Sequence, residues 1–554
     1  MNEHESTLGA PDTPDDLNSG KRDFLKLMGG ASIGLGLGLP TLAAGAQSPP
    51  TCDVTVISGS NVRRTSAYQV RLRAAQVQRA EFECSRTPNG DEASLPANIN
   101  SFSKGLAHND LGEVSPSAYQ TLVFALNTNS RAALATVTMG TTPATRLIAP
   151  FHGFNYSLAG PDPQGVPCPP PPNFSSAEAA AEMVELYWLA LTRDVPYAAY
   201  GSDPMIAAAC ADLNAQPGYR GPRSNGQVTP ANVFRGNFPG ELEGPLLSQF
   251  LVRPIPHGPY EHEQKLRPFV AGNNFQVSYA DWLLAQRGGG AGPTPVESTA
   301  VYQRNGRDLA AYLLSDYGAQ PALEAALILN RLGAPPNPSL PAQAPNEAGL
   351  VGGFNQFVQL LGGAQAPAIT ACFYQKWQVH RRARPDAYSG RVQNHLSGQA
   401  SYPIPAELLN SAALAATFSR YGNYLLPMAY KVGNPVHPSY PAGHASSVGA
   451  TVTVLKALYR GDFVLSGNKV ASADGSSLLD YAGPLTVEGE LNKLAANIAL
   501  GRDTAGVHFR SDSVEGLLQG ERVALAFLAE LRPTLPASFA GFTLRTFSGV
   551  QVTV

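Results

Sequence analysis

Helix-length windows of amphipathic sequence run through most of this chain, and they constrain its fold more than any other feature. Apolar residues recur in them at the three- and four-residue spacing of a helix face. Strand patterns are confined to 54–57, 136–139 and 546–554. The helical windows cover residues 117–127, 175–193, 277–286, 307–317, 321–332, 354–361, 367–383, 405–420, 442–459, 486–500 and 512–531. The chain is therefore predicted to be all-α, with helical bundles, long loops and a few short strands.

The loops and the composition favour one large domain. Proline-rich loops such as 167–172 and 335–345 separate the helical windows, but no linker divides the chain. We expect residues 47–554 to form a single domain, with its chemistry in the last third. The 39 Lys and Arg against 42 Asp and Glu give a net charge of −3, which argues against a nucleic-acid-binding protein. No apolar run of membrane-spanning length follows the N-terminal segment, so stable membrane insertion is not expected.

Residues 1–46 have the layout of an export signal. Lys21 and Arg22 precede an apolar, glycine- and leucine-rich stretch over 27–44, and small residues around Ala44 fit a cleavage site before Gln47. The basic pair resembles a twin-arginine signal with Lys21 in place of the first arginine. We therefore expect cleavage and export to a periplasmic or extracellular location. A short membrane anchor is the alternative.

The five cysteines show no metal-binding spacing. They are Cys52, Cys84, Cys168, Cys210 and Cys372, and no two form a CxxC pair. A zinc site is therefore not indicated, whereas disulfides are compatible with export. The odd number leaves one thiol free or pairing between subunits. Cys52–Cys84 is the bridge that we favour.

Three segments in the last third of the chain gather cations and histidines. The first contains Lys376 and Arg384, eight residues apart. On one helix this spacing is two full turns plus 80°, so both side chains lean toward one side. Pro385 is expected to end or bend that helix. Taken alone, the segment is also compatible with a solvated basic face.

The second segment runs from His437 to Ser447. Pro441 suits the first turn of a helix, and the helical window begins directly after it. Gly443 would then present a bare backbone N–H at a helix N-terminus, which is a favourable place for an anion. His444 lies beside it as a candidate acid or base. A proline–glycine helix start with incidental histidines is the plain alternative.

The third segment contains Arg502 and His508. Gly501 and Gly506 predict a turn rather than a continuing helix, and Asp512 is expected to open the next helix. His508 would lie just before that helix, with Arg502 folded back beside it. A polar loop between helices would explain the same residues.

Together the three segments offer one lysine, two arginines, a backbone N–H and two histidines. Arginine presents forked donors to oxyanions and lysine a point charge, while histidine can coordinate a central atom. So many cations at one place would repel one another without an anion between them. The inventory therefore indicates a tightly held tetrahedral or trigonal-bipyramidal oxyanion.

These segments resemble the signature of the vanadium-dependent haloperoxidases, which share a site and a core fold with the type-2 phosphatidic acid phosphatase superfamily. The eight-residue spacing from Lys376 to Arg384, together with His437, is similar to the bromoperoxidase branch of algae, cyanobacteria and other bacteria. The stretch 101–109, SFSKGLAHN, also resembles that branch. The resemblance implies a core of two four-helix bundles, a vanadate-binding core in about 366–531, and a homo-oligomer, a dimer or larger.

The resemblance also implies a role for each site residue. Vanadate, with vanadium as V5+, would be the cofactor, bonded at the metal by His508. Its oxygens would be bound by Lys376, Arg384, Arg502 and the N–H of Gly443. His444 would act as acid and base, Lys376 would activate the peroxide, and His437 would tune the halide site. Structural calcium is a further cofactor known in relatives, although no EF-hand-like loop is found here.

Two positions qualify the match. Most relatives have serine where this chain has Ala442, and the loss of that hydroxyl donor would cost about 1–2 kcal/mol if nothing replaces it. Phe373, one turn before Lys376, is either a wall of the halide pocket or a core residue.

The expected function is a haloperoxidase that uses hydrogen peroxide to oxidise bromide and iodide, with chloride poor, and so halogenates an organic acceptor. One alternative is an exported acid phosphatase of the same superfamily, with His508 as nucleophile and His444 as acid. Another is a non-catalytic secreted helical assembly protein, which only Ala442 supports.

Overall fold

The computed structural model describes residues 60–80, 86–341, 354–535 and 538–554. The chain divides into two units, Met1–Arg64 and Thr65–Val554, and the second contains the helical bundles. The predicted export signal, the predicted strand at 54–57 and both cysteines of the predicted Cys52–Cys84 bridge lie outside the described residues. Cys168, Cys210 and Cys372 are buried free thiols.

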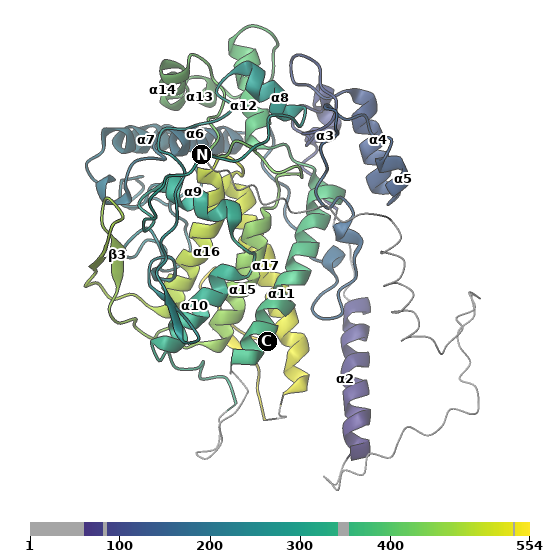
Figure 1. Cartoon of the computed structure of the whole chain (residues 1–554). Coiled ribbons are helices and arrows are strands. Elements are labelled where there is room, and N and C mark those ends of the chain that lie inside the picture. Colours follow the sequence, from purple (N-terminus) through teal and green to yellow (C-terminus); the bar gives the residue numbers. More distant parts are fainter. Residues whose placement is uncertain (1–59, 81–85, 342–353, 536–537) are drawn as a thin grey trace, which may run out of the picture. The chain divides into compact units, whose positions relative to one another are not determined.

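Four long helices pack side by side around the main apolar core (Figure 1). They are α11 (Phe354–Tyr374), α15 (Gly443–Leu458), α16 (Val487–Thr504) and α17 (Arg510–Leu531). α15 and α17 approach closely because α17 has glycines at the contact: a Cβ on Gly520 would lie 2.2 Å from the carbonyl oxygen of Ser446. The bundle thus buries its apolar faces and brings the start of α15 next to the start of α17.

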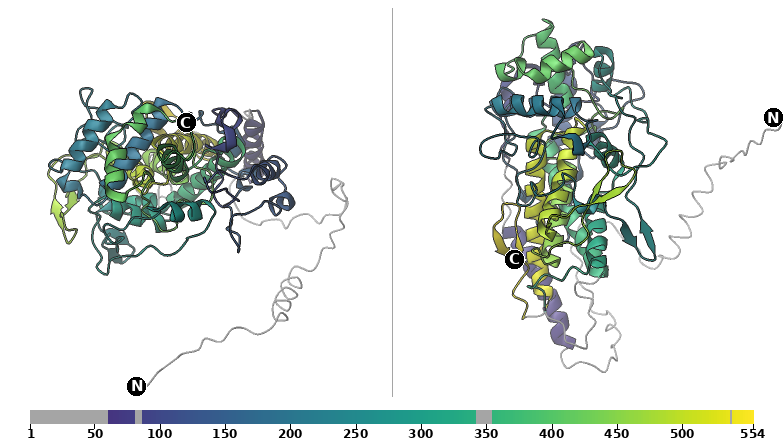
Figure 2. Two further views of the ribbon diagram at one scale, coloured as in Figure 1. Left: turned by 90° about the horizontal axis from the view of Figure 1, so that it is seen from above. Right: turned by 90° about the vertical axis from the view of Figure 1, so that its left-hand side faces the viewer.

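A second helical group packs at one end of this bundle, as the right-hand view in Figure 2 shows. It contains α6 (Ala177–Leu191), α7 (Pro204–Ala215), α13 (Ala406–Leu409) and α14 (Ala412–Tyr421). α6 is buried on nearly every side and begins inside the predicted window 175–193, where Ser176 accepts a hydrogen bond from the N–H of Ala179. The all-α prediction is confirmed.

Shorter elements complete the described chain. The remaining helices of four or more residues are α2 (Ser60–Ala80), α3 (Asp91–Ser94), α4 (Pro116–Asn127), α5 (Arg131–Leu134), α8 (Tyr279–Gln286), α9 (Gly306–Ser315), α10 (Gln320–Arg331) and α12 (Pro385–Leu396). Three antiparallel pairs are formed by β1 (Ile255–His257) with β2 (Tyr260–His262), β3 (Lys469–Ala471) with β4 (Leu478–Asp480), and β5 (Thr543–Arg545) with β6 (Gln551–Thr553). The predicted strand at 546–554 overlaps β6, whereas 136–139 makes only one isolated bridge, from Met139 to Leu106.

Several predicted boundaries were wrong. The windows 354–361 and 367–383 form one helix, α11, which contains Pro367 and widens into a π-helical turn over Gln375–His380. Pro385 begins α12 rather than ending a helix, which suits its fixed φ and missing N–H. The window 405–420 splits into α13 and α14. Gly501 is inside α16 because it allows close packing: a Cβ there would lie 2.3 Å from Leu313.

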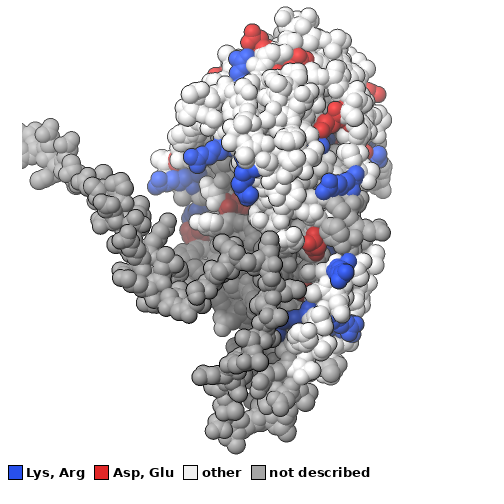
Figure 3. Space-filling view, turned by 90° about the vertical axis from the view of Figure 1, so that its right-hand side faces the viewer, with Lys and Arg blue, Asp and Glu red and all other residues white. Residues whose placement is uncertain are grey.

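Charged side chains are sparse on the surface. Figure 3 shows one face, on which acidic and basic residues are scattered among uncharged ones without a large patch of one sign. This agrees with a composition of only 15% charged residues. Within the described ranges, no helix has the length and apolar character needed to cross a membrane.

Candidate active site

Lys376 is a fully buried cation held by neutral partners. It lies in the π-helical turn that follows α11, and its Nζ donates to the carbonyl oxygens of Pro438 at 2.8 Å and Ser439 at 2.7 Å. Desolvation lowers the pKa of Lys376 from its usual 10.5 to about 7, and the charges of Arg384 and Arg502 act in the same direction. The side chain thereby joins the first predicted segment to the second.

Arg384 is where all three predicted segments meet. Its Nη1 donates to the carbonyl of Val507 at 2.6 Å and to Nε2 of His508 at 3.0 Å. Its Nε donates to the carbonyl of His437 at 3.0 Å, and its Nη2 lies 3.0 Å from Nδ1 of the same residue. The geometry differs from the one-helix prediction, since Lys376 and Arg384 belong to different helical elements.

The backbone changes direction between Lys376 and Arg384 because of the residues just before Arg384. Arg381 adopts a left-handed conformation with φ of 42°, which ends the helical run. The extended chain after it pairs with the predicted stretch near 101–109: Phe102 N–H donates to Arg381 O, and Ala383 N–H donates to Asn100 O. This pairing places Arg384 directly before α12.

His508 is oriented by a buried carboxylate. Its Nδ1 lies 3.0 Å from Oδ2 of Asp512, which also accepts hydrogen bonds from the N–H of Phe509 and the hydroxyl of Ser439. A proton on Nδ1 satisfies that contact and leaves Nε2 as the acceptor that faces Arg384. Desolvation lowers the pKa of His508 well below its ordinary value, so the ring is neutral.

The start of α15 presents open backbone donors. Ala442 is the N-cap residue and has no side chain to cap the helix, and the N–H of Gly443 has no hydrogen-bond partner among the described residues. His444 comes next, with Nε2 2.9 Å from Oδ1 of Asp316, which assigns the proton to Nε2 and leaves Nδ1 as acceptor. Desolvation and the charge of Arg502 lower the pKa of His444, and Asp316 partly offsets them.

Arg502 reaches the site from the last turn of α16. Its Nη1 donates to Leu313 O at 2.8 Å and to the hydroxyl of Tyr430 at 3.1 Å, and its guanidinium lies 5.3 Å from the centre of the Tyr430 ring. Its Nε is buried and has no hydrogen-bond partner in the described structure. The charge of Arg502 acts on Lys376, Arg384, His444 and His508, which places it in the same cluster.

Three buried cations of this cluster pair with no carboxylate of the described residues. In the described part of the chain, Lys376, Arg384 and Arg502 form no salt bridge, and their partners are carbonyls, a phenol and imidazoles. Arg382 and Arg510 are comparably buried, and each binds a glutamate. Since a buried cation is costly without a counter-ion, this donor set fits a multiply charged oxyanion such as vanadate beside Nε2 of His508.

An aromatic wall flanks the cluster on the side of His437. The ring centre of Phe373 lies 5.2 Å from that of His437 and 5.7 Å from that of His152. All three side chains are partly exposed, so the wall borders solvent. One side of Phe373 packs against an apolar cluster that includes Phe102 and Trp377, so Phe373 is a core residue and a wall residue at once.

Sequence patterns alone did not predict that two carboxylates, those of Asp512 and Asp316, would contact the histidines of the site. Asp512 was interpreted only as a helix start, although the four-residue spacing from His508 is a signal that could have revealed the contact. Asp316 is far from His444 in sequence, and no local pattern marks it. All the predicted site residues, from Lys376 to His508, are otherwise brought to one place.

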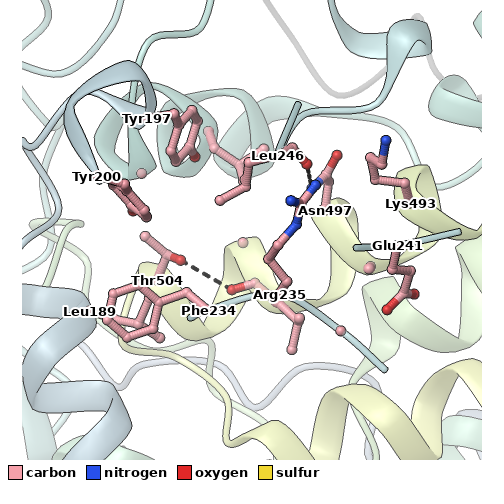
Figure 4. Close-up of a pocket in the computed structure, with 16 residues that line it drawn as sticks. Leu189, Tyr197, Tyr200, Phe234, Arg235, Glu241, Leu246, Lys493, Asn497 and Thr504 are labelled. Carbon is pink, nitrogen blue, oxygen red and sulfur yellow. Dashed lines mark hydrogen bonds between the residues drawn. The ribbon is translucent and has the colours of Figure 1, made fainter. Parts of the chain in front are cut away.

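The cavity drawn in Figure 4 is separate from this cluster. It holds about 30 Å³, enough for a water molecule or two, and runs along one side of α16 from Lys493 through Asn497 to Thr504. Its cations are already satisfied: Lys493 binds Glu490, and Arg235 donates to backbone carbonyls. Neither of these two cations is therefore left for an anion.

Comparison with known proteins gives consistent results. A family model described as the VCPO second helical-bundle domain matches residues 356–534. A vanadium-dependent bromoperoxidase of Ascophyllum nodosum is 35% identical over 522 residues, covering 88% of this chain and 92% of the relative. One of Corallina pilulifera is 31% identical, covering 85% and 93%.

A solved structure is also similar over nearly the whole chain. It is the homohexameric second vanadate-dependent bromoperoxidase of Ascophyllum nodosum, with a TM-score of 0.86 and 28% sequence identity. The match covers 91% of this chain and 94% of that one. The likeness therefore extends well beyond the residues 356–534 that the family model matches.

Proposed function

Because this chain belongs to the vanadium-dependent bromoperoxidases and is a haloperoxidase, we propose that it binds vanadate in the cluster around His508 and uses hydrogen peroxide to oxidise bromide and iodide. The product would be a hypohalous-acid equivalent that halogenates an organic acceptor. The observation that carries the proposal is a set of three buried cations that pair with no carboxylate of the described residues. They lie around Nε2 of His508, an unprotonated nitrogen that accepts a hydrogen bond from Arg384 and could bond to a metal.

Each residue is assigned a role by its contacts. Nε2 of His508 is the metal ligand, because Asp512 holds the proton on the other ring nitrogen. Lys376, Arg384 and Arg502 bind the oxygens of the anion, together with the N–H of Gly443.

When bound, vanadate supplies a Lewis acid that polarises peroxide without changing its own oxidation state. His444 holds the proton that hydrogen peroxide gives up, at Nδ1, since Asp316 keeps Nε2 protonated. The depressed pKa of His444 keeps Nδ1 unprotonated and ready near neutral pH. Protonated Lys376 has one N–H left after its contacts with the carbonyls of Pro438 and Ser439, and this N–H would donate to an oxygen of the bound anion and withdraw electron density from it.

His437 and Phe373 are the candidates for the halide side of the site. Desolvation, with Arg384 and Lys376 nearby, lowers the pKa of His437 well below its ordinary value, so the ring is a neutral neighbour for a halide. The aromatic face of Phe373 gives a large, polarisable anion an apolar wall. We expect bromide and iodide to be oxidised well and chloride poorly.

Three further parts of the proposal concern the protein's surroundings. The twin-arginine-like segment supports export, and the homohexamer of the similar solved structure supports a homo-oligomer here. Structural calcium stays a prediction, since the described residues contain no group of three or more His, Cys, Asp or Glu side chains placed to hold a metal ion.

The decisive experiment compares wild type with His508→Ala. After bound anions are stripped, vanadate binding is measured by calorimetry, and bromination of a dione reporter is monitored with peroxide. Wild type should bind vanadate and brominate only when both vanadate and bromide are present, and the variant should do neither. Phosphate-ester hydrolysis that vanadate inhibits would instead support the acid phosphatase, and absence of tight vanadate binding in wild type would support the non-catalytic alternative.

A further inference from the structure

The hairpin of β1 and β2 carries two exposed histidines on one face. The antiparallel register pairs His257 with Tyr260 and Ile255 with His262. Since paired residues share a face and side chains alternate along a strand, the side chains of all four leave from the same face. His257 and His262 are thus diagonal neighbours across the pair, a relation in which long side chains meet.

The two imidazole rings are spaced as they would be around a shared metal ion. Their ring centres lie 5.8 Å apart, with an angle of 56° between the planes. A metal bound to an imidazole nitrogen at about 2.0–2.1 Å lies about 3.2 Å from the ring centre. Two such ligands at a tetrahedral angle would place their ring centres about 5.2 Å apart, and a wider angle would give about 5.8 Å.

Neither imidazole is committed elsewhere. The structure gives no hydrogen-bond partner to either His257 or His262 among the described residues, and both are exposed. By contrast, His108, His395 and His444 each hold a hydrogen bond through a ring nitrogen. The nitrogens of the hairpin pair are therefore available to a ligand from solvent.

The hairpin is also stiff. Gly258, with φ of 61°, and Pro259 form a tight turn between the strands, and Pro254 and Pro256 restrict the chain before it. Little backbone conformational entropy therefore remains to be lost when the two rings are fixed by a common ligand, and the cost is that of the two side chains.

We propose that His257 and His262 together bind one divalent transition-metal ion of the zinc, nickel or copper class, with water completing the coordination. Imidazole nitrogen suits these ions, whereas calcium and magnesium prefer oxygen. No third His, Cys, Asp or Glu joins the pair among the described residues, so the site is open and its affinity modest. It shares no residue with the vanadate cluster and does not depend on the function proposed there.

The test is a titration of the protein with Zn²⁺ by calorimetry, carried out with and without vanadate so that zinc bound at the histidines of the active site is recognised. Wild type should bind one equivalent at the hairpin. His257→Ala and His262→Ala should each weaken that binding at least tenfold, and the double variant should be no worse than either, because the site needs both rings. Tyr260→Ala is the matched control, as Tyr260 is exposed on the same face.

A second measurement identifies the ligands. With one equivalent of Cu²⁺, the electron paramagnetic resonance spectrum should show two coupled nitrogens in wild type and in Tyr260→Ala, and fewer in either histidine variant. The proposal is overturned if zinc binding persists unchanged in either histidine variant, or if wild type binds no zinc at millimolar concentration. Equal loss in Tyr260→Ala would also overturn it, because binding would then depend on the hairpin's integrity rather than on its imidazoles.

Discussion

Asp512→Asn should impair two properties that can be measured separately, namely the orientation of His508 and the stability of the core. Oδ2 of Asp512 accepts from His508, Ser439 and the N–H of Phe509, and Oδ1 accepts from Arg382 at 2.8 Å. Asparagine has one oxygen and one NH2 group in place of the two oxygens. Its NH2 group would therefore face a donor, either the guanidinium of Arg382 or the protonated Nδ1 of His508. Vanadate affinity should therefore fall about 10- to 100-fold, which is the usual cost of losing the partner that orients a metal-bound histidine.

The same substitution should also lower the free energy of unfolding. It breaks one of the two carboxylate contacts of buried Arg382, and breaking a buried ion pair costs about 3–5 kcal/mol. Because Glu182 remains, we expect the lower end of that range. Calorimetric titration with vanadate at low temperature measures the first effect, and urea unfolding measures the second.

Glu182→Gln is the matched control. Glu182 binds the other side of the Arg382 guanidinium at 2.9 Å but does not touch His508. The Glu182→Gln protein should lose about as much stability as Asp512→Asn, while its vanadate affinity stays within about threefold of wild type. The reasoning would be refuted if a folded Asp512→Asn protein bound vanadate as tightly as wild type, or if Glu182→Gln weakened vanadate binding equally.

Three other predictions can be checked separately. Asp316→Asn should lower bromide turnover at least tenfold but change vanadate affinity less than about threefold, because Asp316 contacts His444 and not the metal ligand. Steady-state kinetics measures the turnover and calorimetry the affinity, and unchanged turnover with weaker vanadate binding would contradict the assignment. Ala442→Ser should tighten vanadate binding about five- to tenfold through one added donor, and a gain in stability alone, from capping α15, would contradict this. Burial raises the pKa of Glu241 from 4.5 to about 8, so between these pH values the folded state keeps a proton that the unfolded chain releases. The free energy of unfolding should therefore fall by about 1.4 kcal/mol for each pH unit in that range. Urea unfolding at several pH values measures this slope, and Glu241→Gln should abolish it.

Local sequence patterns predicted the helices with the strongest periodicity and missed those set by tertiary contacts. α4, α8, α10 and α15 lie within a few residues of their predicted windows. α12 was missed because Pro385 signals a break as readily as a helix start, and only the turn at Arg381 decides between them. Gly501 was misread because a glycine that permits close packing looks the same in sequence as one that permits a turn.

The sequence alone determined the residue types of the site and their order, because a cage for an oxyanion needs lysine, arginine and histidine whatever the fold. It also determined the helical class, since periodicity is a local property of the chain. Only the tertiary structure decided how these residues meet: the left-handed Arg381 directs Arg384 toward His508, and Asp316 reaches His444 from the end of a helix that is distant in sequence. Such contacts depend on packing between distant segments, and local propensity carries no record of it.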